Sequence, residues 1–169
     1  PFDQNGINQV KYKTGNPPGS NEDFTGTLPP TSPQTITIDK EGITPLHVWL
    51  VDGKGAESYM NTAVVDLRYD SSVLPPLNFQ ETHEVENNAW QNFSDRASFT
   101  WDDPPEFSGI AEYRIYFGPD ADGEEVHATT LTPAYNTQAT ESISFLRLEV
   151  EDSLGNILPW HTYFTFKYD

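Results

Sequence analysis

The sequence predicts an all-β fold built from two copies of one antiparallel unit. Apolar residues alternate with polar ones with a period of two, in runs of roughly five to eight residues. These runs end at Gly, Pro, Asn or Asp, the residues that form turns. The pattern of the first runs recurs about one hundred residues further along the chain. Together these observations favour antiparallel sheets over helices.

The repeat consists of three matched blocks in the same order. The clearest is HVWLVDGKGA at 47–56 against RLEVEDSLGN at 147–156, where the residue numbers differ by 100. The other two blocks match residues 6–15 with 109–118, at a difference of 103, and residues 67–70 with 166–169, at a difference of 99. Because the three differences vary so little, the blocks indicate two copies of one structural unit.

The first unit contains four alternating runs, at residues 7–12, 35–38, 46–50 and 65–69. Each run predicts a strand with one buried face. Residues 15–35 between the first two runs are rich in Pro, Gly and Ser, so they are predicted as a loop.

The second unit has the same kind of pattern. Strands are predicted at residues 77–82, 97–101, 113–117, 146–150 and 163–166, and one helical turn is expected near residues 84–88. The stretches VDGKG at 51–55 and EDSLGN at 151–156 predict matching hairpin turns, in which Asp accepts backbone N–H groups and Gly adopts a positive φ. A ligand-binding role for Asp52 or Asp152 is the alternative.

The stretch SSVLPPL at 71–77 predicts a linker, which places the two domains at residues 1–72 and 73–169. The second unit has about thirty residues before its Ser108-Gly109-Ile110 block, whereas the first has only Pro1–Asn5 before the matching block. The first unit is therefore expected to lack its first two strands. Three explanations remain open: the chain is a fragment, another subunit supplies the strands, or residues 15–35 fold back into the gap.

The composition excludes several classes of partner. The formal net charge is −17, and an acidic surface repels nucleic acid and anionic membranes. No stretch approaches the ~20 apolar residues that a membrane-spanning helix needs. The chain has no Cys, so it forms no disulfide and has no thiol chemistry. Its acidity is explained either by solubility or by binding of divalent cations.

Catalytic motifs are not found in the sequence. There is no G-x-S-x-G stretch, and the four His residues do not have the spacing of a zinc site, so no enzymatic activity is expected. The best metal candidate is a Ca²⁺ site at Asp120, Asp122 and Glu124, where carboxylates alternate around Gly123. The same Asp-Gly stretch also predicts a plain hairpin turn.

Four Trp residues, at 49, 90, 101 and 160, raise the possibility of carbohydrate binding, because sugars stack on exposed aromatic rings. Trp101 lies on a predicted core strand. Trp49 is placed with His47 on the face opposite Leu46, and Trp160 follows Pro159 near the last hairpin. Trp49 and Trp160 are therefore the candidate ligand-binding residues, and burial in the core or in an interface is the alternative.

These motifs resemble a known class of domain. Ser98-Phe99-Thr100-Trp101, Ser108-Gly109-Ile110, Tyr113-Arg114-Ile115-Tyr116 and Asp152-Ser153-Leu154-Gly155-Asn156 are similar to strands and turns of tandem immunoglobulin-like, fibronectin type III-like domains of bacterial cell-surface or secreted proteins. The resemblance implies two sandwiches at a cell surface or in the extracellular space.

The same resemblance implies a function for the chain. It points to a non-catalytic structural or adhesion module, such as a spacer or a subunit of a surface layer or filament. Its partners would be other proteins, including self-assembly or strand complementation at residues 1–15. The alternative is a carbohydrate-binding accessory module of a secreted enzyme.

Overall fold

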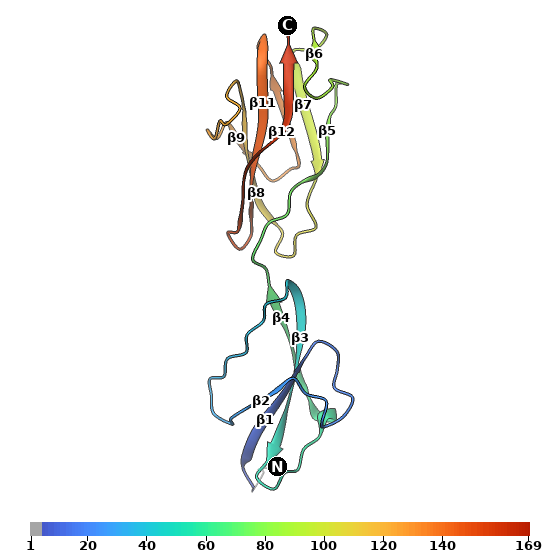
Figure 1. Cartoon of the computed structure of the whole chain (residues 1–169), viewed down its shortest axis with the longest axis vertical. Helices are drawn as coiled ribbons and strands as arrows, with labels where there is room; N and C mark the ends of the chain where they lie inside the picture. Colours follow the sequence, from blue (N-terminus) through green and yellow to red (C-terminus); the bar gives the residue numbers. More distant parts are fainter. Residues whose placement is uncertain (1–4) are drawn as a thin grey trace. The chain divides into compact units, whose positions relative to one another are not determined.

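The computed structural model describes residues 5–169. Internal contacts divide the chain into two units, Pro1–Asp70 and Ser71–Asp169 (Figure 1), where the sequence suggested a boundary after residue 72. The regular elements of the described residues are strands, apart from one 3-10 turn at Tyr59–Asn61. The predicted all-β class is therefore confirmed. None of these residues forms a helix long and apolar enough to cross a membrane.

The second unit contains two sheets that pack face to face (Figure 1). The three-stranded sheet has the order β10-β7-β5, with β10 at Ala134–Gln138, β7 at Arg96–Asp102 and β5 at Leu77–Glu81. The five-stranded sheet has the order β6-β12-β11-β8-β9, comprising Trp90–Gln91, Ile157–Tyr168, Ser142–Asp152, Ile110–Gly118 and Ala128–Thr130. Its pairings are antiparallel except that of β6 with β12. All five strands predicted for this unit are found.

Alternate residues of these strands fill the space between the two sheets. Tyr113 and Ile115 of β8, Leu148 of β11 and Phe99 of β7 are completely buried there. The rings of Phe99 and Phe164 lie 5.2 Å apart between their centroids. Burial of each such side chain stabilises the fold by about 1.5–3 kcal/mol, and aromatic pairs add to that. The period-two pattern of the sequence therefore translates directly into this core.

Two expectations for the second unit are wrong. Residues 71–77 are not a free linker, because Val73 is buried in the core and Leu77 begins β5. No helical turn forms at residues 84–88, because Glu84 and Asn88 have φ angles of 64° and 65°. A positive φ is incompatible with a right-handed helical turn.

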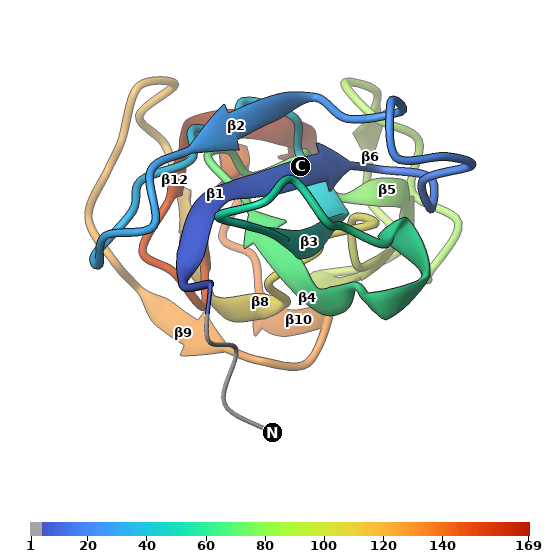
Figure 2. The ribbon, with the colours of Figure 1, turned by 90° about the horizontal axis from the view of Figure 1, so that it is seen from below.

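The first unit contains a single four-stranded antiparallel sheet (Figure 2). Its order is β2-β1-β3-β4, comprising Gly26–Leu28, Ile7–Thr14, Gly42–Asp52 and Ala63–Tyr69. The described residues of this unit form no second sheet, which agrees with the expectation that this unit lacks its first two strands. Part of the predicted loop at residues 15–35 forms β2 instead.

Residues 35–38, predicted as a strand, form no strand and belong to no sheet. Their counterpart at a numbering difference of 100 is β10, which pairs only with β7. The first unit has no counterpart of β7 among its described residues. A strand is defined by its hydrogen-bonded neighbour, and residues 35–38 lack that neighbour.

Strand complementation was expected at residues 1–15, of which residues 1–4 lie outside the described part of the chain. Over Val10–Tyr12, β1 is hydrogen-bonded to β2 on one side and β3 on the other. This part of β1 therefore has no free edge for a further strand. The edges of this sheet are β2 and β4 instead.

The register of the first sheet separates its two faces. We call the apolar face the one formed by Val10, Tyr12, Leu46, Val48, Leu50, Val65 and Leu67. The opposite face contains Lys11, Lys13, His47, Trp49 and Val51. The alternating pattern of the sequence therefore gives the sheet one face of mostly apolar side chains and one face on which charged, polar and apolar side chains are mixed.

Candidate functional site

The two turns with the same sequence pattern have the same geometry. In the second unit, Asp152 Oδ1 accepts the N–H groups of Leu154 and Asn156, each at 2.8 Å. In the first unit, Asp52 Oδ1 accepts the N–H groups of Lys54 and Ala56, at 2.9 and 2.7 Å. Gly155 and Gly55 follow with φ angles of 85° and 82°. Both Asp side chains thus hold a hairpin turn, as the structural interpretation of the sequence predicts.

Hydrogen bonding keeps both carboxylates ionised. Burial by itself raises the pKa of Asp152, but hydrogen bonds from Asn156 and Leu154 outweigh it and hold that pKa below its usual value. The pKa of Asp52 is also lowered, mainly by the hydrogen bond from the Ala56 N–H group. The negative charge therefore strengthens the turn at neutral pH.

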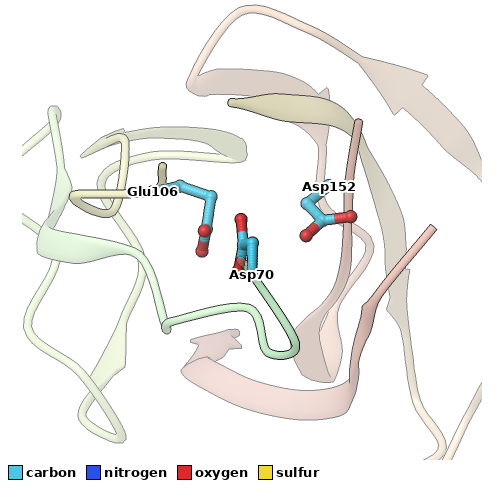
Figure 3. Close-up of side chains that lie close together, drawn as sticks. All are labelled: Asp70, Glu106 and Asp152. Carbon is cyan, nitrogen blue, oxygen red and sulfur yellow. The ribbon is translucent and has the colours of Figure 1, made fainter. Parts of the chain in front are cut away.

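A second carboxylate lies near Asp152 within the same unit. Figure 3 shows Glu106, from the loop between β7 and β8, and Asp152, from the end of β11; their ligand oxygens lie within 4.8 Å of each other. Asp70, also drawn there, is the last residue of the first unit. Sequence reasoning missed Glu106, and its loop carries no motif that could have identified it.

The oxygens of Glu106 already accept hydrogen bonds. Oε2 accepts the N–H group of Leu74 at 3.3 Å, and Oε1 accepts that of Phe107 at 3.0 Å. A Ca²⁺ ion takes about six to eight oxygen ligands. Two carboxylates that each hold backbone N–H groups therefore do not amount to a calcium site by themselves.

The predicted calcium ligands lie in the loop between β8 and β9. Asp120 Oδ1 accepts the N–H group of Asp122 at 3.0 Å, while Asp122 and Glu124 are exposed. Within residues 5–169, these three carboxylates do not form a group with ligand atoms within 4.8 Å of one another. The structure therefore gives the stretch the geometry of a turn and does not bring the predicted ligands together.

Packing explains why this loop contains Gly123. A Cβ atom at this position would lie 2.2 Å from the ring of Tyr116. The Gly123 carbonyl also accepts a hydrogen bond from Arg147 Nη1 at 2.8 Å. The glycine thus lets the loop backbone lie directly against the Tyr116 ring.

Of the two interpretations of Trp49, the structure favours burial over exposure. Its side chain is only 2% exposed, and its indole N–H group donates to Glu57 Oε2 at 3.0 Å. Lys11 Nζ binds the other oxygen of Glu57 at 2.8 Å and donates to the Asn21 carbonyl at 3.0 Å. Loops distant in sequence therefore cover this face of the sheet, and the ring of Trp49 is not available to stack on a sugar.

The other tryptophans differ in exposure. Trp160 is half-buried, and its carbonyl accepts a hydrogen bond from Arg147. Trp90 is 58% exposed, with Lys167 Nζ 5.9 Å from the centre of its ring. Phe93, three residues further along, is also exposed. Exposed aromatic surface in the second unit is thus concentrated on residues that the sequence did not single out.

Comparison with known proteins finds similar solved structures but no similar sequence. Neither the protein-family models nor the curated proteins contain a match to this chain. One similar solved structure is that of the fibronectin(III)-like modules of Clostridium thermocellum CbhA, with 15% identity over the whole of this chain and 82% of that chain, and a TM-score of 0.38. Another is that of titin domains A168–A170, with 11% identity over 96% of this chain and 59% of that chain, and a TM-score of 0.48.

Because both scores are below 0.5, the fold assignment depends on the strand order of the chain itself. In the second unit, three strands in the order β10-β7-β5 face a sheet containing β12-β11-β8-β9. That is the two-sheet arrangement shared by immunoglobulin-like and fibronectin type III sandwiches. The second unit is therefore an immunoglobulin-like sandwich, and the first unit repeats one of its two sheets.

Proposed function

We propose that this chain is a non-catalytic structural module of an exported protein, in which immunoglobulin-like units act as spacers or assembly elements. One observation carries the proposal: the carboxylates and the tryptophan that were candidates for binding a metal ion or a sugar have structural roles. Asp52, Asp120 and Asp152 hold turns, and Trp49 is buried with its N–H group bonded. The fold supports such a role, because sandwiches of this kind serve widely as modular frameworks.

A spacer must resist force as a unit, and this can be measured on single molecules. When the chain is stretched from its ends, the 99 residues of the second unit should be released in one step of roughly 330–360 Å less the end-to-end length of the folded unit, because each extended residue adds about 3.3–3.6 Å. A double substitution of Phe99→Ala and Leu148→Ala should abolish the step by opening the core. Gradual extension of the unsubstituted chain would contradict the proposal.

Carbohydrate binding is the second candidate, and the exposure of Trp90 favours it. Electrophoresis through gels containing soluble polysaccharides separates the two functions. For a purely structural module, mobility should be the same with and without polysaccharide. Retardation that Trp90→Ala or Trp160→Ala abolishes, and that Trp49→Phe leaves intact, would establish an accessory binding module instead.

A further inference from the structure

The strand β4 forms one edge of the first sheet (Figure 2). It pairs with β3 along its whole length, from Ala63 opposite Val48 to Tyr69 opposite Gly42. Its other side has no partner strand, and among the described residues no backbone hydrogen bond outside the β3–β4 ladder involves residues 63–69. A row of unpaired N–H and C=O groups on an edge strand is a template for pairing with another strand.

This edge has few of the features that usually protect an edge strand. With seven residues, β4 is the longest edge strand among the described residues, since β5 and β10 have five, β2 and β9 have three, and β6 has two. It contains no Pro and no Lys, and its ladder has no register shift, whereas the ladder of β5 shifts between Leu77 and Gln80. Val64 and Val65 are 56% and 52% exposed. The edge is therefore open to a further strand.

The second unit shows that a strand can occupy this edge. Its strand β12 corresponds to β4 at a numbering difference of 99, and it pairs with β11 on one side as β4 pairs with β3. On its other side β12 pairs with β6 at Lys167 and Tyr168, which are the counterparts of Arg68 and Tyr69. The same side of β4 has no strand among the described residues.

Two charged residues of β4 indicate which strand fits there. Asp66 and Arg68 are exposed, and neither side chain forms an ion pair among the described residues. Both lie on the same face of the sheet, because side chains of a strand alternate between its faces. In an antiparallel ladder, directly opposite residues are either both hydrogen-bonded to each other or both not. When a strand pairs with its own copy, opposite residues are therefore both odd-numbered or both even-numbered, and one residue faces itself across a two-fold axis.

The charges decide which residue faces itself. If Asp66 or Arg68 lay opposite its own copy, two like charges would meet, which destabilises a sheet. With Val65 at the centre, neither charge would meet an opposite one. With Leu67 at the centre, Asp66 faces Arg68 of the second copy and Arg68 faces its Asp66, so both charges are paired. On the apolar face of this arrangement, Leu67 meets its own copy and Val65 faces Tyr69.

We infer that the edge strand β4 is a self-association site, at which two copies of this chain pair antiparallel with Leu67 on the two-fold axis and Asp66 of each copy ion-paired with Arg68 of the other. The pairing joins the two first sheets into one continuous sheet. It is a weak association, because a single pair of strands buries little surface. This inference goes beyond the proposed function and holds whether the module is a spacer or a binding module.

Charge reversal tests this inference, because it can both break and restore the pairing. The molar mass of the whole chain is measured by light scattering at concentrations up to about 1 mM, the range in which a small interface is populated. The mass of the wild type should rise toward twice 19.0 kDa. Asp66→Arg and Arg68→Asp should each weaken dimerisation by at least about tenfold, because each substitution places like charges opposite each other at two positions.

The matched control is the double variant Asp66→Arg/Arg68→Asp, which has the composition of the wild type and should dimerise as the wild type does. An equimolar mixture of the two single variants should also dimerise, because two Asp side chains of one chain then face two Arg side chains of the other. A wild-type chain that stays at 19.0 kDa would overturn the inference. Single variants that associate as tightly as the wild type, or a mixture that stays monomeric, would overturn it as well. The stretching test of the proposed function is independent of these results.

Discussion

At the scale of single residues, the chain uses carboxylates to build turns. Asp52 and Asp152 hold matching hairpins through backbone N–H groups, and Asp152 is only 1% exposed. The sequence predicted this role because Asp and Gly recur at the same spacing in both units. It could not predict Glu106 as a neighbour of Asp152, because that approach depends on how two distant loops meet.

The Asp152 turn predicts a pH-dependent stability. Because the folded-state pKa of Asp152 is lowered from 3.8, its contribution is fully present above the unfolded pKa and is lost as the pH falls through the folded pKa. Asp152→Ala should cost about 1–3 kcal/mol at pH 7, because it removes the buried carboxylate that accepts the N–H groups of Leu154 and Asn156. Urea unfolding at pH 7 and in acid should show a smaller pH dependence in Asp152→Ala than in wild type. The same loss at both pH values would contradict this role.

Two tyrosines, Tyr163 with a buried hydroxyl group and the fully buried Tyr113, predict opposite effects of substitution by Phe. Tyr163 Oη is buried with no hydrogen-bond partner among the described residues, and burial raises the pKa of Tyr163 to about 12. Tyr113 Oη donates to Asp103 Oδ1 at 2.7 Å. Tyr163→Phe should therefore be neutral or stabilising by about 1 kcal/mol, while Tyr113→Phe should destabilise by about 1 kcal/mol. Thermal unfolding of both variants checks this, and the reverse order would be inconsistent with the geometry.

At the scale of elements, the alternating pattern predicted most of the long strands, including the edge strands β4 and β5, and it missed β2, β6, β9 and β10. It failed at residues 35–38, because pairing requires a strand that the pattern cannot supply. It placed Trp49 on the correct face, but it could not show that the loops carrying Asn21 and Glu57 cover that face. A local pattern gives the faces of a strand, but which face is covered is decided by contacts over long sequence separations.

Ion pairs between β8 and β11 predict a salt-dependent stability. Arg114 of β8 binds Glu112 on its own strand and Glu149 and Glu151 on β11. Arg114→Met leaves three carboxylates close together and should cost about 1 kcal/mol at low ionic strength. The loss should shrink in about 1 M NaCl, because salt screens the repulsion. Arg114→Lys should be intermediate, and a loss that does not depend on salt would rule out the electrostatic origin.

The loop between β8 and β9 predicts how the second unit responds to calcium. Because Asp120, Asp122 and Glu124 do not converge, CaCl2 in place of EDTA should leave the unfolding temperature unchanged in wild type and in Asp122→Asn/Glu124→Gln alike. Gly123→Ala should instead lower stability by about 1–3 kcal/mol, because its Cβ would clash with Tyr116. A rise in unfolding temperature with calcium that the double variant abolishes would restore the calcium site.

At the scale of the whole molecule, the two copies of the unit differ in how many of the two sheets of a sandwich they contain. The second has two sheets around a buried core, whereas the first has one sheet whose apolar face leaves Leu50 and Val65 each 52% exposed, although Leu46 beside them is buried. Sequence repeats revealed the two units and the missing strands. The sequence did not predict which face of each sheet is buried, because burial depends on contacts between strands and loops that are distant in the sequence.

Hydrogen exchange on the intact 169-residue chain tests this account most directly, because matched strands in one molecule are compared under identical conditions. The amides of residues 46–50 in β3 and of residues 146–150 in β11 occupy equivalent positions in the two units. The structure predicts that those in β3 exchange at least about 100-fold faster, because the core that covers their counterparts is absent. Equal protection of the two strands would show that the first unit is complete in solution and would contradict the account.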